Sequence, residues 1–207
     1  MQSISKSCSF EPFHHFGTKV TLAIVLSISL LVTGCSAAWI STALADLPVL
    51  TQMALNLATL VTTLQSGQQI DPAEVTAVQN ISSEASRDLA LLQGFYNQYK
   101  SNPNADTLQK IQSTISTITE TLPALLQSAH VSDPTLSARV TAGVNLILTT
   151  VASFSALMPQ ATPAASQRIA GMKVSIPSAK ELKKQWNLQV CAPSPTFHSA
   201  LSVCVVR

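Results

Sequence analysis

The side chains with catalytic potential in this chain are few and scattered. Glu84 and Asp88 lie four positions apart with Arg87 between them, and Glu120 stands alone further along. Two carboxylates on one helix face could perform general acid/base chemistry. No nucleophile, base or metal ligand occurs near them at a spacing typical of a catalytic or metal site. We therefore interpret them as members of a solvated helix face.

Histidines and glycines offer no alternative site. After residue 35 the only histidines are His130 and His198, and this part of the chain contains no Glu-x-x-His, His-Glu-x-x-His or Cys-x-x-Cys spacing. Every glycine is isolated, so the chain has no glycine-rich phosphate loop. We expect His130 at a helix end, where it could interact with the last carbonyls. The sequence therefore predicts no metal site, no cofactor and no enzymatic activity.

A different kind of chemistry is indicated near the N-terminal end. Lys19 precedes an uncharged apolar stretch, Val20–Val32, and Thr33-Gly34-Cys35 follows it. The stretch is too short to span a bilayer comfortably and is typical of the apolar region of a secretory signal. An ordinary cleaved signal with an incidental cysteine, or an uncleaved anchor, is the alternative interpretation.

The run Val32-Thr33-Gly34-Cys35 resembles the lipobox of bacterial lipoproteins, and the resemblance covers about the first 36 residues. It implies cleavage between Gly34 and Cys35, a diacylglyceryl thioether on the Cys35 sulfur, and acylation of the new amino terminus by palmitate-type chains. Two or three acyl chains bind a membrane stably. The residue after Cys35 is Ser36 and not the Asp that retains such proteins in an inner membrane. Where the host has two membranes, the resemblance therefore implies an anchor in the outer membrane that faces the periplasm.

In an exported chain, the two remaining cysteines suggest a disulfide. Cys191 and Cys204 each lie in a β-rich apolar run, 188–191 and 201–206, with Pro193-Ser194-Pro195 between the runs. We predict a Cys191–Cys204 bond that closes a hairpin. Two free, buried cysteines are the alternative.

The body of the chain has the composition of a helical protein with few charges. Of its 207 residues only 11% are charged, and its net charge of +2 does not indicate nucleic-acid binding. Apolar residues recur every three or four positions along four seams: 47–64, 75–99, 108–129 and 140–158. Asp71-Pro72 and Asp133-Pro134 are helix-start signals. Short joints predict an all-α, up-down-up-down four-helix bundle.

Two features of the helical pattern leave alternatives open. Pro48 and Pro123 lie inside the first and third seams, so we expect either kinks or late helix starts there. The stretch Val140–Met158 is long and apolar enough to be a transmembrane helix, but hydroxyl and amide side chains lie on most of its faces. We interpret it as a central bundle helix.

The lipobox resemblance implies a signal, 1–34, and the charge balance divides the rest into a lipid-anchored bundle, 35–160, and a basic extension, 161–207. In the extension we predict a short helix, Ala179–Asn187, with Leu182 and Trp186 beside three lysines. This helix could lie on anionic lipid or dock on the bundle, and we favour docking.

Together these features predict a non-enzymatic, lipid-anchored protein of the bacterial envelope. It would act as an interaction or assembly module at the membrane surface, with the membrane and an envelope protein as partners. The alternative is a bundle that binds a small apolar ligand or a lipid in its core.

Overall fold

The fold is all-α. In the computed structural model, the described residues are 18–65, 70–158 and 176–191, with side chains of the first helix described from Trp39 to Thr63. The helices are α1 (Thr18–Gln65), α2 (Pro72–Ser101), α3 (Ala105–Ser128), α4 (Pro134–Leu157) and α6 (Ala179–Trp186), followed by a π-helical turn, η1 (Asn187–Cys191). No strand occurs in these described ranges.

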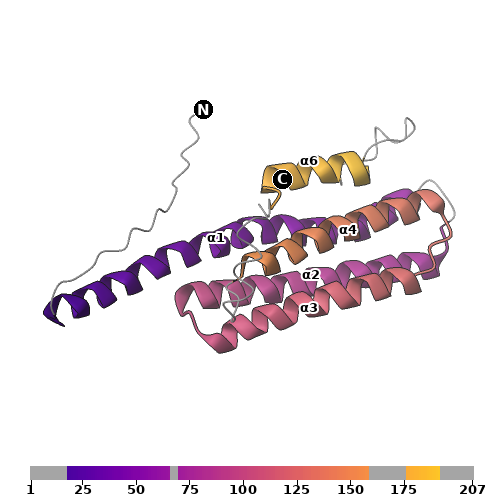
Figure 1. Ribbon diagram of the computed structural model, residues 1–207. Coiled ribbons are helices and arrows are strands. Elements are labelled where there is room, and N and C mark those ends of the chain that lie inside the picture. The colour runs from indigo at the N-terminus through magenta and orange to yellow at the C-terminus, as the bar shows by residue number, and fades with distance from the viewer. Residues whose placement is uncertain (1–17, 66–69, 159–175, 192–207) are drawn as a thin grey trace. The chain divides into compact units, whose positions relative to one another are not determined.

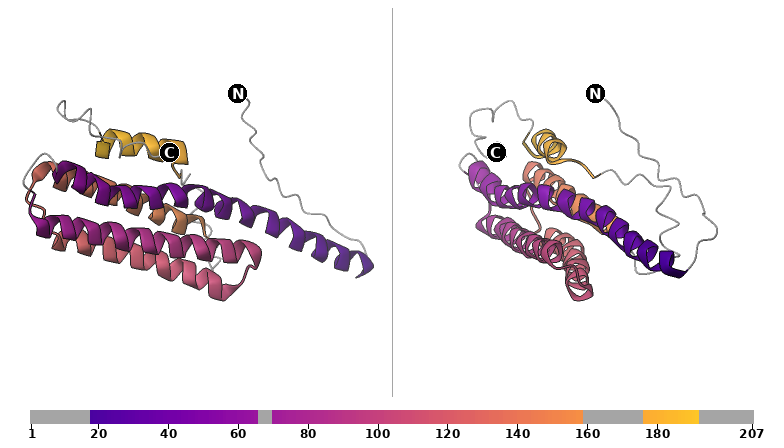
Figure 2. Two further views of the ribbon diagram at one scale, coloured as in Figure 1. Left: turned by 180° about the vertical axis from the view of Figure 1, so that it is seen from behind. Right: turned by 90° about the vertical axis from the view of Figure 1, so that its left-hand side faces the viewer.

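The chain divides into two compact units, Met1–Ser36 and Ala37–Arg207. The second unit contains the bundle, built from α1 after residue 36 together with α2, α3 and α4 (Figure 1). Within it, α2 and α3 run antiparallel side by side, as two views agree (Figure 2), and α3 packs on α4. The predicted four-helix bundle is confirmed at the level of an all-α bundle.

Local side-chain chemistry explains where the helices begin. The Asp71 carboxylate accepts a 2.8 Å hydrogen bond from the Ala73 N–H, and the Asp133 carboxylate accepts one of 2.6 Å from the Leu136 N–H. In both helices a proline follows, where its missing N–H costs nothing. Asn104 caps α3 in the same way, through the Thr107 N–H at 2.8 Å. The two Asp-Pro helix starts are therefore confirmed.

The end of α3 is marked by His130, which has a positive φ of 41°. This left-handed conformation is uncommon for a residue with a Cβ and breaks the helical path. The prediction that His130 lies at a helix end is correct.

Pro48 and Pro123 lie inside α1 and α3, so the alternative of late helix starts is wrong. A proline inside a helix removes one backbone hydrogen bond. The neighbouring residues Leu47 and Leu122 are fully buried or nearly so, at 0% and 1% exposure. The packing of these two leucines in the core offsets the hydrogen bond lost at each proline, so each helix continues past its proline.

The apolar seams form the core. The seam positions with described side chains are Leu47, Leu50, Ala54, Leu57, Val61; Val75, Val78, Ser82, Ala85, Leu89, Leu92, Tyr96, Tyr99; Leu108, Ile111, Ile115, Ile118, Leu122, Leu125, Ala129; and Val140, Val144, Ile147, Val151, Phe154, Met158. All of them are buried except Tyr99, Leu108 and Leu125, which are half-buried. The core also uses apolar residues between these positions, including Met53, Leu60 and Ile81. A buried hydrogen bond of 2.7 Å, from the Ser82 hydroxyl to the Ala54 carbonyl, ties α2 directly to α1.

The predicted short basic helix is α6, and it docks on the bundle. Leu182 and Trp186 are buried, at 0% and 1% exposure, and α6 packs beside α4 (Figure 1). Lys180 and Lys184 are exposed and Lys183 is half-buried. The alternative, in which the apolar face of this helix lies on anionic lipid, does not fit, because Leu182 and Trp186 are already enclosed by protein.

The residues before the predicted disulfide are not a strand. Asn187–Cys191 forms the π-helical turn η1, which directly continues α6. Val190 and Cys191 are buried in this conformation, and η1 packs on α4. The expected first strand of the hairpin is therefore wrong: residues 188–191 are helical, and this conformation buries Val190 and Cys191 and leaves Leu188 exposed. Cys204 lies outside the described residues.

Among the residues whose side chains are described, two helical segments are long and apolar enough to cross a membrane, Trp39–Thr63 and Pro134–Leu157. About half of the most apolar window of each is buried within the protein, 50% and 44% respectively. On α4, Val140, Val144 and Ile147 are fully buried, whereas Asn145 and Thr149 are exposed. This pattern is typical of a central bundle helix, as we had predicted for 140–158.

Candidate functional site

The predicted lipidation site lies close in sequence to an aromatic cluster. Gly34 and Cys35 fall within the backbone range of α1, but their side chains lie outside the described ones. Three residues, Ser36–Ala38, separate Cys35 from Trp39, the first described buried side chain. Any chemistry on Cys35 is therefore held a short covalent distance from the bundle core.

The ring of Trp39, near the start of the bundle part of α1, connects α1 to α2 and, through Tyr96, to α4. Its ring centroid lies 5.4 Å from that of Tyr96 in an edge-on arrangement and 5.8 Å from that of Tyr99, both on α2. Tyr96 in turn meets Phe154 of α4 at 6.2 Å. Edge-on aromatic pairs of this kind stabilise beyond their buried area. The cluster therefore fixes the start of the bundle part of α1 against α2 and α4.

The polar atoms of this cluster are enclosed. Tyr96 is fully buried, and burial raises the pKa of its hydroxyl above the ordinary value of 10.0. Neither the Tyr96 hydroxyl nor the Trp39 Nε1 has a hydrogen-bond partner among the described residues. Because the phenol stays protonated, its role here is packing.

We call this region the Trp39 end of the bundle: Trp39, residues 95–101 of α2, residues 104–110 of α3, and Phe154. The ends of α2 and α3 meet here because only Asn102, Pro103 and Asn104 connect them. The Lys110 ammonium lies 5.8 Å from the centre of the Phe95 ring, which links the two helices. The opposite end, which contains Asp71, Glu74 and the joint 130–133, is called the Ser132 end.

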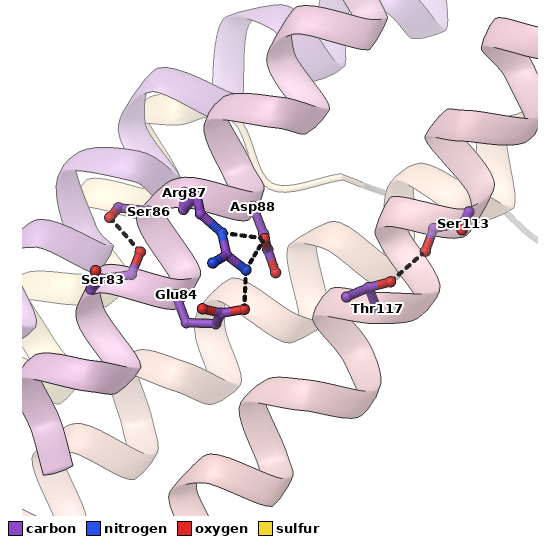
Figure 3. Close-up of polar contacts among 7 residues, drawn as sticks. All are labelled: Ser83, Glu84, Ser86, Arg87, Asp88, Ser113 and Thr117. Carbon is purple, nitrogen blue, oxygen red and sulfur yellow. Dashed lines mark hydrogen bonds and ion pairs between the residues drawn. The ribbon is translucent and has the colours of Figure 1, made fainter.

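The carboxylate pair singled out from the sequence is brought together with its arginine (Figure 3). The Arg87 guanidinium contacts the carboxylates of both Glu84 and Asp88, the second at 3.3 Å. Arg87 is 63% exposed and Glu84 27%, but the Asp88 side chain is only 5% exposed. The solvated-face interpretation is therefore wrong for Asp88. Its side chain is buried, and the exposed guanidinium of Arg87 supplies its counter-charge.

The remaining sequence candidates stay separate. Glu120 is exposed and accepts a 2.8 Å hydrogen bond from the Ser116 hydroxyl one turn earlier. On the same helix the Thr117 hydroxyl donates to the Ser113 carbonyl (Figure 3). Within the described part of the chain, no three His, Cys, Asp or Glu side chains gather in a way that could hold a metal ion. His198 lies outside the described residues.

Asp46 is a buried charged residue that the sequence analysis did not single out. It is 2% exposed, and its carboxylate faces the backbone N–H of Ala179, the first residue of α6, while its Oδ2 has no hydrogen-bond partner among the described residues. Burial raises the pKa of this carboxyl above its ordinary value of 3.8, and the Ala179 N–H lowers it less. A signal was available, because Asp46 is the sole charged residue between positions 37 and 70.

Two further buried charges were also missed. Glu74, 8% exposed, accepts a 2.8 Å hydrogen bond from the Ser132 N–H and so ties the start of α2 to the α3–α4 joint. Arg139 of α4 is 5% exposed, and its Nη1 has no partner among the described residues. Both act in packing between helices, which periodicity alone does not reveal.

Cys191 is buried at 7% exposure and takes part in a disulfide bond. Its predicted partner, Cys204, lies outside the described residues, so the pairing Cys191–Cys204 stays a prediction.

A surface depression of about 420 Å³ lies on the outer side of α3. Asp106, Gln109, Lys110 and Ser113 line it, and all four belong to one helix. A hollow between the side chains of a single helix does not enclose a ligand.

In comparisons with protein-family models, curated proteins and solved structures, nothing matches this chain. Its function must therefore be argued from its own residues.

Proposed function

We propose that the protein is a non-enzymatic lipoprotein of the bacterial envelope, held at the membrane by acyl chains on Cys35. Its helical bundle acts as an interaction or assembly module at the membrane surface. The observation that carries the proposal is the run Val32-Thr33-Gly34-Cys35, which follows an uncharged apolar stretch and is separated by three residues from Trp39, the first described buried side chain of the bundle.

The burial of apolar side chains between the helices of the bundle favours attachment by a lipid anchor over attachment by a membrane-spanning helix. The two segments long enough to span bury Leu47, Leu57, Val144 and Ile147 completely against other helices. A helix that faced lipid would keep its apolar residues outside instead. The acyl chains then supply membrane attachment, with about 0.8 kcal/mol for each buried methylene.

Close packing supports a module over the alternative, a core that opens for a small apolar ligand or lipid. A Cβ added at Gly143 of α4 would lie 2.8 Å from Leu57 Cδ2 and 3.1 Å from Trp186 Cζ3. Three elements therefore meet at this point with less space than a methyl group needs. Ligand binding inside the bundle would require α6 or α1 to move.

Membrane fractionation tests the anchor. We expect the wild-type protein to stay with membranes in alkaline carbonate and to enter detergent, and Cys35→Ala to become soluble. Ser36→Ala, which keeps the lipobox, is the matched control and should behave as wild type. Membrane-bound Cys35→Ala that resists carbonate would overturn the proposal in favour of a spanning helix.

The site of residence is tested by the residue after the anchor. In a host with two membranes we propose that the wild-type protein faces the periplasm from the outer membrane. Ser36→Asp should then move it to the inner-membrane fraction, whereas Ser36→Ala should not. Wild-type protein found in the inner membrane would contradict this part of the proposal.

The module itself is tested by cross-linking in cells, followed by identification of the linked protein. We expect a product that forms with the wild-type protein and decreases strongly with Cys35→Ala at equal protein level, because attachment concentrates both partners at one surface. An equal yield from both proteins would show that the interaction does not depend on the membrane.

A further inference from the structure

We propose that the Trp39 end of the bundle rests directly on the phospholipid headgroups, with anionic lipid as its partner. This inference depends on the proposed lipidation of Cys35 and adds an orientation to it. The bundle would stand with its Trp39 end on the membrane and its Ser132 end pointing away.

The covalent reach of the anchor carries the first step. Only Ser36, Ala37 and Ala38 lie between Cys35 and Trp39. Even fully extended, this connection spans at most about 14 Å between the two Cα atoms, and about 6 Å as helix. The polar layer of one leaflet is itself about 5–8 Å thick. Trp39 is packed in the core, so the core end itself must come within reach of the headgroups.

The side chains at this end suit a membrane interface. Phe95 and Tyr99 are half-buried, and Lys100 and Lys110 are exposed beside them. Aromatic rings with one wet edge and lysines with long apolar stems are the side chains that favour the headgroup layer. The Lys110 ammonium over Phe95 places a cation and an aromatic ring at the same spot.

The charges at the two ends differ in sign. Among the described residues, the Trp39 end has Lys100 and Lys110 against Asp106, a positive balance. The Ser132 end has the carboxylates Asp71, Glu74 and Asp133 and, among its described residues, no lysine or arginine. An anionic leaflet attracts basic groups close to its surface and repels carboxylates. The charge pattern therefore favours the same orientation as the anchor.

A pair of labels measures this orientation. Purified lipidated protein is placed in vesicles of phosphatidylethanolamine and phosphatidylglycerol that contain a lipid with a nitroxide on its headgroup. A fluorescent thiol label is attached at Asn102→Cys, on the Trp39 end, or at Thr135→Cys, on the Ser132 end. Both native side chains are exposed, so neither substitution disturbs the core.

We expect the nitroxide lipid to quench the label at position 102 about twofold and to leave the label at position 135 nearly unchanged, because a helix of the length of α2 separates them by roughly 40 Å. Equal quenching at both positions would overturn the proposal, because it describes a bundle that tumbles or lies flat. No quenching at either position would also overturn it, because the bundle would then be held off the surface.

An insertion variant provides the matched control. Twenty Gly and Ser residues placed between Ser36 and Ala37 extend the tether by roughly 25 Å without touching the core. Quenching at position 102 should fall toward the value at position 135. Unchanged quenching would show that contact with lipid does not depend on the short tether.

The failure of this inference is distinguishable from failure of the proposed function. The mass of the vesicle-bound protein reports whether Cys35 bears acyl chains. If the chains are absent, the proposed anchor fails. If they are present and the two labels behave alike, the anchor stands and the orientation fails.

Discussion

The buried Asp46 carboxylate of α1 faces the backbone N–H of Ala179 at the first turn of α6. A carboxylate at a helix N-terminus satisfies an otherwise unpaired N–H and interacts favourably with the helix dipole. The Ser178 hydroxyl accepts from the Glu181 N–H at 3.3 Å and completes the cap. Asp46 thereby connects two elements that are far apart in the sequence.

Asp46→Ala should lower the free energy of unfolding by about 1 kcal/mol at pH 7, since it removes the carboxylate that faces the Ala179 N–H. Asp46→Asn keeps an oxygen acceptor and removes the buried charge, so it should be at least as stable as wild type. Urea unfolding measures both. Equal losses for the two variants would contradict this role for Asp46.

The pH dependence of the same pair follows from the raised pKa of Asp46. A carboxyl whose pKa is higher in the folded state stabilises that state fully below pH 3.8, and this contribution is lost as the pH rises through the folded-state pKa. The stability of wild type relative to Asp46→Asn should therefore increase toward acidic pH. A difference that does not vary with pH would contradict the assignment.

Gly143 and Gly94 should respond oppositely to alanine. Alanine favours a helix by about 1 kcal/mol over glycine. At Gly94 nothing lies within 4 Å of an added Cβ, so Gly94→Ala should raise the free energy of unfolding by about 0.5–1 kcal/mol. At Gly143 the contact with Leu57 Cδ2 would be 2.8 Å, and overpacking costs about 1–3 kcal/mol, so Gly143→Ala should lower stability. If thermal unfolding shows that both variants gain stability, the close approach of α1, α4 and α6 is wrong.

Glu74 and Glu120 form a second matched pair. Glu74→Ala removes the acceptor of the Ser132 N–H and should cost about 1–2 kcal/mol, whereas Glu74→Gln should recover much of it by keeping an oxygen there. Glu120→Ala, on an exposed face, should change stability by less than about 0.5 kcal/mol. Denaturant titration of the three variants measures this order, and a larger loss at Glu120 would refute it.

The disulfide at Cys191 should be intramolecular and should link Cys191 to Cys204. Closing a loop of this length contributes roughly 3 kcal/mol, so reductant should lower the unfolding midpoint. Peptide mapping of unreduced protein should find one fragment that contains both cysteines. A Cys191 joined to Cys35 would contradict both this pairing and the lipid on Cys35, because a sulfur bears only one of the two bonds.

The helices were predictable because their signals are local. Asp71-Pro72 and Asp133-Pro134 each supply a capping carboxylate and a first-turn proline within a few residues, and the start of each helix follows from these alone. The buried positions were also predictable, because apolar residues recur in the sequence with the period of an α-helix.

Contacts between distant segments were not predictable. In the sequence, Glu74 looks like an ordinary acidic residue in the first turn of a helix. Its burial and its hydrogen bond depend on Ser132, which lies 58 positions away. Asp88 reads as solvated because its exposed partner Arg87 stands beside it in the sequence. The apolar run 188–191 suits strand or helix equally well, and the docking of α6 on α4 decides for helix.

The N-terminal peptide of protein extracted from membranes tests the account most directly. Mass spectrometry should find that the chain begins at Cys35, with a diacylglyceryl group on its sulfur and an acyl chain on its amino terminus. A peptide that begins before residue 35, or an unmodified Cys35, would contradict the lipoprotein account and the membrane orientation that depends on it.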